Sequence, residues 1–171
     1  HANFASEGFS VTRNMWNGYG QADYKPLSSL KLVAGGQWNK LESIHSNFVP
    51  RFGALMNFGP NWGAKLLHAQ AFRAPFAGET DVQGATLRGN KSLQPETIAT
   101  TDAQVYYKAD RYRIAATAFQ SKQKNRIIRV LVPPSTTIFT FANVGILNSK
   151  GVELESEASP TRQLSLEGSF T

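Results

Sequence analysis

The stretch Gly-Val-Glu-Leu-Glu-Ser-Glu-Ala at positions 151–158 alternates between glutamates and uncharged side chains. Val152 and Leu154 fall on one side of this alternation, and the three glutamates fall on the other. Successive side chains of a β-strand point to opposite faces of a sheet. The stretch therefore predicts a strand with one apolar face and one charged face.

The same period of two recurs along most of the chain. Seven further segments, each with an apolar set opposing a polar set, lie at 16–25, 30–39, 51–58, 62–73, 100–108, 112–119 and 164–170. Together with the first stretch they predict about eight strands. In this interpretation every ionic side chain of the predicted strands lies on a polar face.

The connections between these segments alternate in length. Short connections fall at 26–29, 59–61, 109–111 and 159–163, and long ones fall at 40–50, 74–98 and 122–149. Tight turns at one end and long loops at the other are typical of a transmembrane β-barrel, whose turns face the periplasm. A soluble β-sandwich has no reason to sort its connections in this way.

Aromatic side chains stand at the ends of the apolar faces, and small residues stand in the middle. The aromatic positions are Trp16, Tyr24, Trp38, Phe52, Phe58, Trp62, Phe72, Tyr107 and Tyr112. Aromatic rings with one polar, solvated edge are enriched at membrane interfaces. Tilted strands of about ten residues cross an apolar band of about 25 Å. The predicted fold is all-β: an antiparallel transmembrane β-barrel segment of about eight meandering strands, with short periplasmic turns and long extracellular loops.

The composition excludes several other classes of protein. The 171 residues include no cysteine, which excludes a disulfide scaffold, a Cys-ligated zinc site and a thiol nucleophile. The net charge of +6 is spread along the chain, so we expect no nucleic acid partner. His1, His45 and His68 lack metal-ligand spacing, and no nucleophile elbow or phosphate loop occurs. We therefore expect no enzyme activity, no metal site and no cofactor.

Several short motifs follow one another in a specific order. They are Pro-Arg-Phe-Gly at 50–53, Asn-Trp at 61–62, Ala-Phe-Arg-Ala-Pro at 71–75, Gly-Asn-Lys-Ser-Leu-Gln-Pro-Glu-Thr at 89–97, Phe-Ala-Asn-Val-Gly at 141–145 and Lys-Gly-Val-Glu-Leu-Glu at 150–155. Over about 18–171, this succession resembles the C-terminal barrel half of TonB-dependent outer-membrane receptors.

The resemblance implies a place in the bacterial outer membrane and a barrel of about twenty-two strands closed around a plug. Such receptors import ferric siderophores, haem, cobalamin or sugars. No plug domain or energy-coupling box precedes Trp16, so we expect 1–171 to be a single, partial barrel domain, with a loop tail at 1–15 and barrel strands at 16–171. Its expected partners are a ferric siderophore or similar small ligand, outer-membrane lipid, and the TonB complex acting through the missing plug.

The expected ligand-binding residues lie in the long loops at 40–49, 74–97 and 122–148, with Arg73 at the barrel mouth. They are Arg73, Glu79, Arg88, Asn90, Lys91, Glu96, His45, Arg126 and Arg129. The basic balance of the chain favours an anionic ligand such as a ferric siderophore.

Structural interpretations compete with these ligand-binding ones. We favour an ion pair between Arg73 and a lumen acid such as Asp102, because lumen charges pair to offset desolvation. For Glu96, the structural alternative to ligand binding is a local cap or a local ion pair. The glutamates of 151–158 face lysines and arginines of neighbouring strands across a wet lumen, which explains them more simply than catalysis. The apolar stretch 127–132 extends a strand pair above the membrane.

Two other hypotheses remain for the whole chain. One is a self-contained eight-stranded barrel with a structural or adhesion role, which requires pairing between the first and last strands. The other is a β enzyme, either soluble or in the outer membrane. Its soluble form requires another layer to cover the aromatic-rich face.

Overall fold

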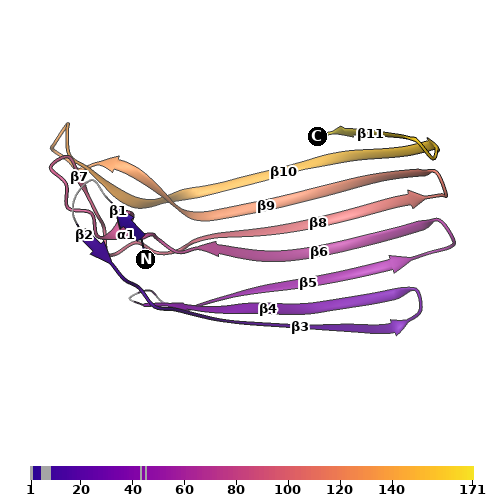
Figure 1. Cartoon of the computed structure of the whole chain (residues 1–171), viewed down its shortest axis with the longest axis horizontal. Coiled ribbons are helices and arrows are strands. Elements are labelled where there is room, and N and C mark those ends of the chain that lie inside the picture. The colour runs from indigo at the N-terminus through magenta and orange to yellow at the C-terminus, as the bar shows by residue number, and fades with distance from the viewer. Residues whose placement is uncertain (1, 5–8, 43, 45) are drawn as a thin grey trace.

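The computed structural model describes residues 2–4, 9–42, 44 and 46–171. Its main feature is one extended antiparallel sheet in which each long strand pairs with the next along the chain (Figure 1). The eight long strands are β3 (Met15–Leu27), β4 (Leu30–Leu41), β5 (Asn47–Asn57), β6 (Trp62–Arg73), β8 (Glu96–Lys108), β9 (Tyr112–Leu131), β10 (Phe139–Thr161) and β11 (Leu164–Phe170). The predicted meander of about eight strands is confirmed.

Smaller elements gather at one end of this sheet. Strand β7 (Leu87–Arg88) pairs in parallel with the start of β10, and helix α1 (Ala77–Thr80) lies in the same long connection between β6 and β8. Strands β1 (Ala2–Phe4) and β2 (Phe9–Val11) form a separate hairpin within the expected loop tail. Figure 1 shows these elements at the end opposite the tight turns. We call the two ends the loop end and the turn end.

The two outermost long strands lie on opposite sides of the sheet. Strand β3 pairs only with β4, and β11 pairs only with β10, among the residues that the structure describes. A self-contained eight-stranded barrel requires β3 and β11 to pair with each other. The sheet of this chain is therefore a curved segment of a barrel wall, and the hypothesis of a self-closed barrel does not fit it.

The two faces of the sheet have opposite chemistry. The outer face carries Trp16, Trp38, Phe52 and Trp62, whose side chains are 71%, 46%, 54% and 48% exposed. No described element covers this aromatic face, so the two-layer soluble enzyme does not fit the structure either. Instead, the apolar outer face matches the surface that a barrel turns to hydrocarbon.

The inner face carries the polar side chains and pairs many of them across neighbouring strands. Lys31 Nζ lies 2.8 Å from Asp23 Oδ2, and Arg113 Nη1 lies 3.3 Å from Glu155 Oε2. For Glu155, the expected cation on a neighbouring strand is confirmed. This face fits a wet lumen.

Four lysines beyond the predicted strands lie on the other face. Lys40, Lys122, Lys124 and Lys150 lie within strands and on the outer face, since their register partners belong to the outer set. The strands continue beyond the apolar alternation from which they were predicted. Hydrogen bonding between strands does not stop where the hydrocarbon stops, so the ladder runs on into a region where charged side chains are soluble.

The predicted long loop at 122–149 is likewise mostly strand. The ladder between β9 and β10 continues to the pair Leu131–Phe139, which leaves only 132–138 as the connection. The expected extension of the strand pair through 127–132 is confirmed as far as Leu131. No helix among the described residues is both long and apolar enough to cross a membrane.

The two faces predict different responses to the same substitution. In a receptor that carries this chain, Val105→Arg places a guanidinium on the outer face, within the apolar band. It should lower the free energy of unfolding by about 2–4 kcal/mol. Val33→Arg, the matched change on the inner face opposite Asp23, should cost much less. Urea unfolding in lipid vesicles measures both; equal losses would contradict the assignment of the faces.

Candidate functional site

The connection between β6 and β8 begins with a tightly anchored turn at the loop end. Pro75 is fully buried, and the backbone N–H of Phe76 donates a 3.1 Å hydrogen bond to Glu79 Oε2. This bond satisfies a backbone N–H at the start of helix α1. Glu79 is consequently only 5% exposed, so its carboxylate requires a cationic partner.

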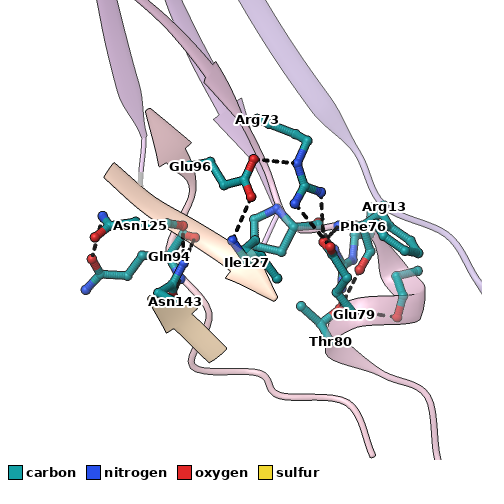
Figure 2. A network of polar contacts seen from close by, with 12 residues as sticks. Arg13, Arg73, Phe76, Glu79, Thr80, Gln94, Glu96, Asn125, Ile127 and Asn143 are labelled. Carbon is teal, nitrogen blue, oxygen red and sulfur yellow. Dashed lines mark hydrogen bonds and ion pairs between the residues drawn. The ribbon is translucent and has the colours of Figure 1, made fainter. Parts of the chain in front are cut away.

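Arg73, at the end of β6, supplies that partner (Figure 2). Its Nη1 and Nη2 donate to Glu79 at 2.9 and 3.1 Å, and its Nε donates to Glu96 Oε2 at 2.9 Å. The other oxygen of Glu96 accepts a 2.6 Å hydrogen bond from the backbone N–H of Ile127. One guanidinium thus joins β6, α1 and β8, and through Glu96 it reaches β9.

The pairing of Arg73 agrees in kind with the structural interpretation favoured from the sequence, but the named partner is wrong. Arg73 lies directly opposite Glu96 in the β6–β8 ladder, whereas Asp102 lies opposite Leu67, farther toward the turn end. The expected local pairing of Glu96 is this same contact. Because three charged groups share their hydrogen bonds, none of them is left available without disrupting the others.

A second cluster connects the motif at 89–97 to β10. The Asn143 side chain donates from Nδ2 to the Gln94 carbonyl at 2.8 Å, and its Oδ1 accepts from the Gln94 N–H at 2.8 Å. The same amide donates to the Asn125 carbonyl, while Asn90 Nδ2 donates to the Phe141 carbonyl, both at 2.8 Å. Figure 2 shows Asn143 beside Gln94 and Asn125. The Asn143 side chain thus supplies to the irregular backbone at Gln94 the hydrogen bonds that a neighbouring strand would otherwise supply.

Asn143 lies near a local distortion of the long hairpin. Asn125 has a φ of 56° and Gly145 has a φ of 59°. They face each other across the β9–β10 ladder, whose register is the same on both sides of them. Both residue types tolerate this left-handed conformation better than others do. The ladder therefore bends here without losing its alignment.

A third cluster links the segment before β3 to helix α1. Arg13 donates to the Pro75 carbonyl at 3.1 Å, to Asp81 Oδ2 at 2.5 Å and to the Thr80 hydroxyl oxygen. Burial raises the pKa of the Asp81 carboxyl, but hydrogen bonds from Thr80 and Arg13 outweigh burial and hold that pKa below its usual value. Asp81 is therefore ionised at neutral pH and keeps the Arg13 contact in place.

The nine expected ligand-binding residues fall into distinct groups. Arg73, Glu79 and Glu96 bind one another, and Asn90 anchors its loop. Lys91 is 80% exposed in its side chain and only loosely paired with Asp81, at 3.8 Å. Arg88, Arg126 and Arg129 are exposed at the loop end, where Arg129 lies 4.6 Å from the ring centre of Phe139. His45 lies outside the described residues.

Sequence reasoning missed four of the residues that build this site. Arg13, Asp81 and Gln94 carry no periodic signal, and Arg13 bonds to residues 62–68 positions away. Asn143 belongs to a motif that carried the resemblance, but no role was predicted for it. Among the described residues no group of three His, Asp or Glu side chains could hold a metal ion.

A hollow of about 510 Å³ lies among the loop-end segments, lined in part by Asn47, Lys91, Gln94 and Asn125. It adjoins the cluster around Asn143, which fixes one of its walls. Lys91 is the charged residue of this lining.

Comparison with known proteins agrees with this architecture. The model of the family described as TonB dependent receptor-like, beta-barrel matches residues 3–171. The chain belongs to this family. Its place is therefore the bacterial outer membrane, with the loop end extracellular and the turn end periplasmic.

The chain is also similar to individual receptors. It is 28% identical over 130 residues to the iron-regulated outer membrane virulence protein of Vibrio cholerae, which covers 72% of this chain and 20% of that protein. The siderophore receptor PirA of Pseudomonas aeruginosa superimposes with a TM-score of 0.80 at 19% identity, covering 91% of this chain and 33% of PirA. The ferric enterobactin receptor PfeA of the same organism gives 0.79 at 19% identity, covering 91% and 26%.

The matches to these receptors are limited to the barrel fold and to part of each relative. The structural matches establish the fold of a receptor barrel wall. The chain spans about a fifth to a third of the length of the relatives that it matches. The relatives are named as receptors and outer-membrane proteins rather than enzymes.

The Arg73 network predicts a local loss of stability when its cation is removed. In the whole receptor, Arg73→Met leaves the buried Glu79 carboxylate without a counter-charge, which should cost about 1–3 kcal/mol in local opening. Faster hydrogen exchange of the 76–81 amides measures this opening. The double change Arg73→Met/Glu79→Gln should recover part of the protection. Arg162→Met, in a periplasmic turn, serves as control; the same exchange rates for Arg73→Met and the control would contradict the network's role.

The contact between Arg13 and Asp81 predicts a pH dependence. The folded pKa of Asp81 is depressed, so its stabilising contribution is full above the unfolded pKa near 3.9. The contribution is lost as the pH falls through the lower, folded pKa. Hydrogen exchange of 76–88, corrected for intrinsic rates, should therefore show loss of protection as the pH falls below about 4. Asp81→Asn should lack this step; an identical step in that variant would assign the transition to another group.

Proposed function

We propose that this chain forms part of the barrel wall of an outer-membrane receptor that imports a ferric siderophore. The proposal draws support from the similar proteins, which are an iron-regulated outer-membrane protein, a siderophore receptor and a ferric enterobactin receptor. In the proposed receptor, 1–171 is one partial barrel domain, with 1–15 belonging to an extracellular loop. A plug domain outside this chain transmits energy from the TonB complex.

The distribution of paired and unpaired charge at the loop end carries the proposal. Each described carboxylate of this region has a hydrogen-bond or ion-pair partner: Glu42 accepts from Asn14, Asp81 from Arg13, and Glu79 and Glu96 from Arg73. Arg88, Lys91, Arg126 and Arg129 are exposed in the same region. The extracellular end therefore keeps an excess of exposed positive charge.

This excess selects for anionic ligands. A concave, positively charged mouth raises the local concentration of anions and speeds their capture. Guanidinium groups bind anionic oxygens in a planar, two-point geometry that lysine cannot match. In the proposed mechanism, Arg88, Arg126 and Arg129 contact the ligand with Lys91. Arg73, Glu79, Asn90 and Glu96 instead hold the loops that present them.

Transport then depends on the inner face of the sheet. The polar side chains of this face, including Lys65, Asp102 and Glu153, line a lumen in which a hydrated ligand meets no hydrocarbon. In the proposed receptor the plug fills this lumen until it is displaced. The chain itself then supplies a static wall and part of the mouth.

Charge reversal at the mouth tests the anionic-ligand proposal. In the whole receptor, the triple change Arg88→Glu/Arg126→Glu/Arg129→Glu should weaken equilibrium binding of ferric enterobactin at least about tenfold. Each lost charge-assisted contact is worth about 1.5–3 kcal/mol when fully formed. The effect should shrink as the salt concentration rises.

A control at the opposite end of the barrel separates the mouth from a general change in charge. Arg111→Glu/Arg162→Glu adds negative charge at the exposed periplasmic turns and should leave binding unchanged. Unaltered affinity in the mouth variant, for ferric enterobactin and for a second anionic ferric siderophore alike, would remove these cations from the proposed site.

A further inference from the structure

Three lysines form a group on the outer face of β9 and β10, next to the extracellular side of the apolar band. Lys122 and Lys124 are two residues apart on β9, and Lys150 on β10 lies opposite Gln120, the residue next to Lys122 on that face. Such diagonal neighbours lie about 7–8 Å apart, and alternate residues of one strand lie at a similar spacing. All three are exposed.

No carboxylate neutralises this group. Among the described residues of the eight long strands, all the aspartates and glutamates lie on the inner face. None of the three lysines takes part in an ion pair within the described residues. Like charges this close repel one another, so the arrangement favours an anion from outside the chain.

A continuous apolar groove runs down the outer face from these lysines. A hollow of about 570 Å³ is lined by Lys150, Thr101, Ala103, Ala118 and Val152. It shares Ala103, Ala118 and Val152 with a second hollow of about 480 Å³ that continues toward the periplasmic end.

The groove exists because its floor is made of small side chains. Ala64, Ala103, Ala116 and Ala118 occupy neighbouring positions of β6, β8 and β9. Larger residues stand around them, and Trp62 packs edge-on against Tyr107 at 5.1 Å below the groove. A shallow apolar groove open to hydrocarbon can hold an acyl chain.

We infer that this groove binds one phosphorylated lipid of the outer leaflet, with its phosphate at Lys122, Lys124 and Lys150 and an acyl chain along Ala103, Ala118 and Val152. Lysine is a compact charge that binds phosphate well, and its long stem reaches from the apolar surface toward the headgroup level. The inference rests on the family's membrane placement and not on the identity of the imported ligand.

The lysine arm of the test compares two double variants of the whole receptor, each of which removes two positive charges. The receptor is reconstituted in nanodiscs that contain a small fraction of diphosphoryl lipid A, and native mass spectrometry measures lipid retained on the protein. Lys122→Gln/Lys150→Gln should weaken retention about thirtyfold, since each lysine near an anionic surface contributes about fivefold. Lys25→Gln/Lys108→Gln, which removes the same charge near the periplasmic end, should retain the lipid.

The groove arm fills the channel without changing the charge. Ala118→Phe should reduce retention of the same lipid, whereas Ala34→Phe, on the outer face of β4 and away from the groove, should not. Dephosphorylated lipid A should bind the unmodified receptor weakly. Heat-modifiable migration shows that each variant is folded.

Two outcomes would overturn the inference: equal retention in the lysine variant and its control, or equal binding of phosphorylated and dephosphorylated lipid. Ferric enterobactin binding by the unmodified receptor is measured separately. Its absence would count against the proposed function and leave the lipid result to stand alone.

Discussion

A backbone N–H or C=O group cannot stay unpaired in hydrocarbon, and the whole architecture follows from this constraint. Each long strand from β4 to β10 therefore has a hydrogen-bonded neighbour on both sides. With the backbone satisfied, the side chains have only to sort themselves between two faces. The sorting is complete for carboxylates, which all lie on the inner face of the described strands, and incomplete for lysines, because a lysine stem can pass along apolar surface to reach water.

The apolar band does not follow the register of the sheet. Tyr24 ends the apolar set of β3 at the turn end, and its row of cross-strand partners leads through Leu66 to Val152. Val152, however, begins the apolar set of β10, next to Lys150. A level membrane that crosses strands tilted by about 35–45° produces this shift. The tilt lifts the loop-end halves of β9 and β10 out of the hydrocarbon and makes their lysines tolerable.

The tilt also shows what the sequence could predict and what it could not. Alternation of apolar and polar residues predicts a strand only where one face is apolar. The predicted strand therefore ends at Phe119, although β9 continues to Leu131. The partner of Arg73 depends on the register across the long connection at 74–95, which no local pattern specifies. Arg13 and Asn143 act between segments 49–68 positions apart, where periodicity carries no information at all.

The polar side chains of the extracellular end have two different roles. Arg73, Glu96 and Asn143 come from the motifs that carried the family resemblance, and they form their hydrogen bonds with other parts of the chain. A group whose donors and acceptors are already satisfied gains little from a ligand, because binding must first break what it holds. Exposed groups such as Arg88 and Arg126 pay no such cost. The motifs therefore fix the shape of the mouth, and in the proposed receptor the three arginines that bind the ligand, Arg88, Arg126 and Arg129, lie outside the motifs.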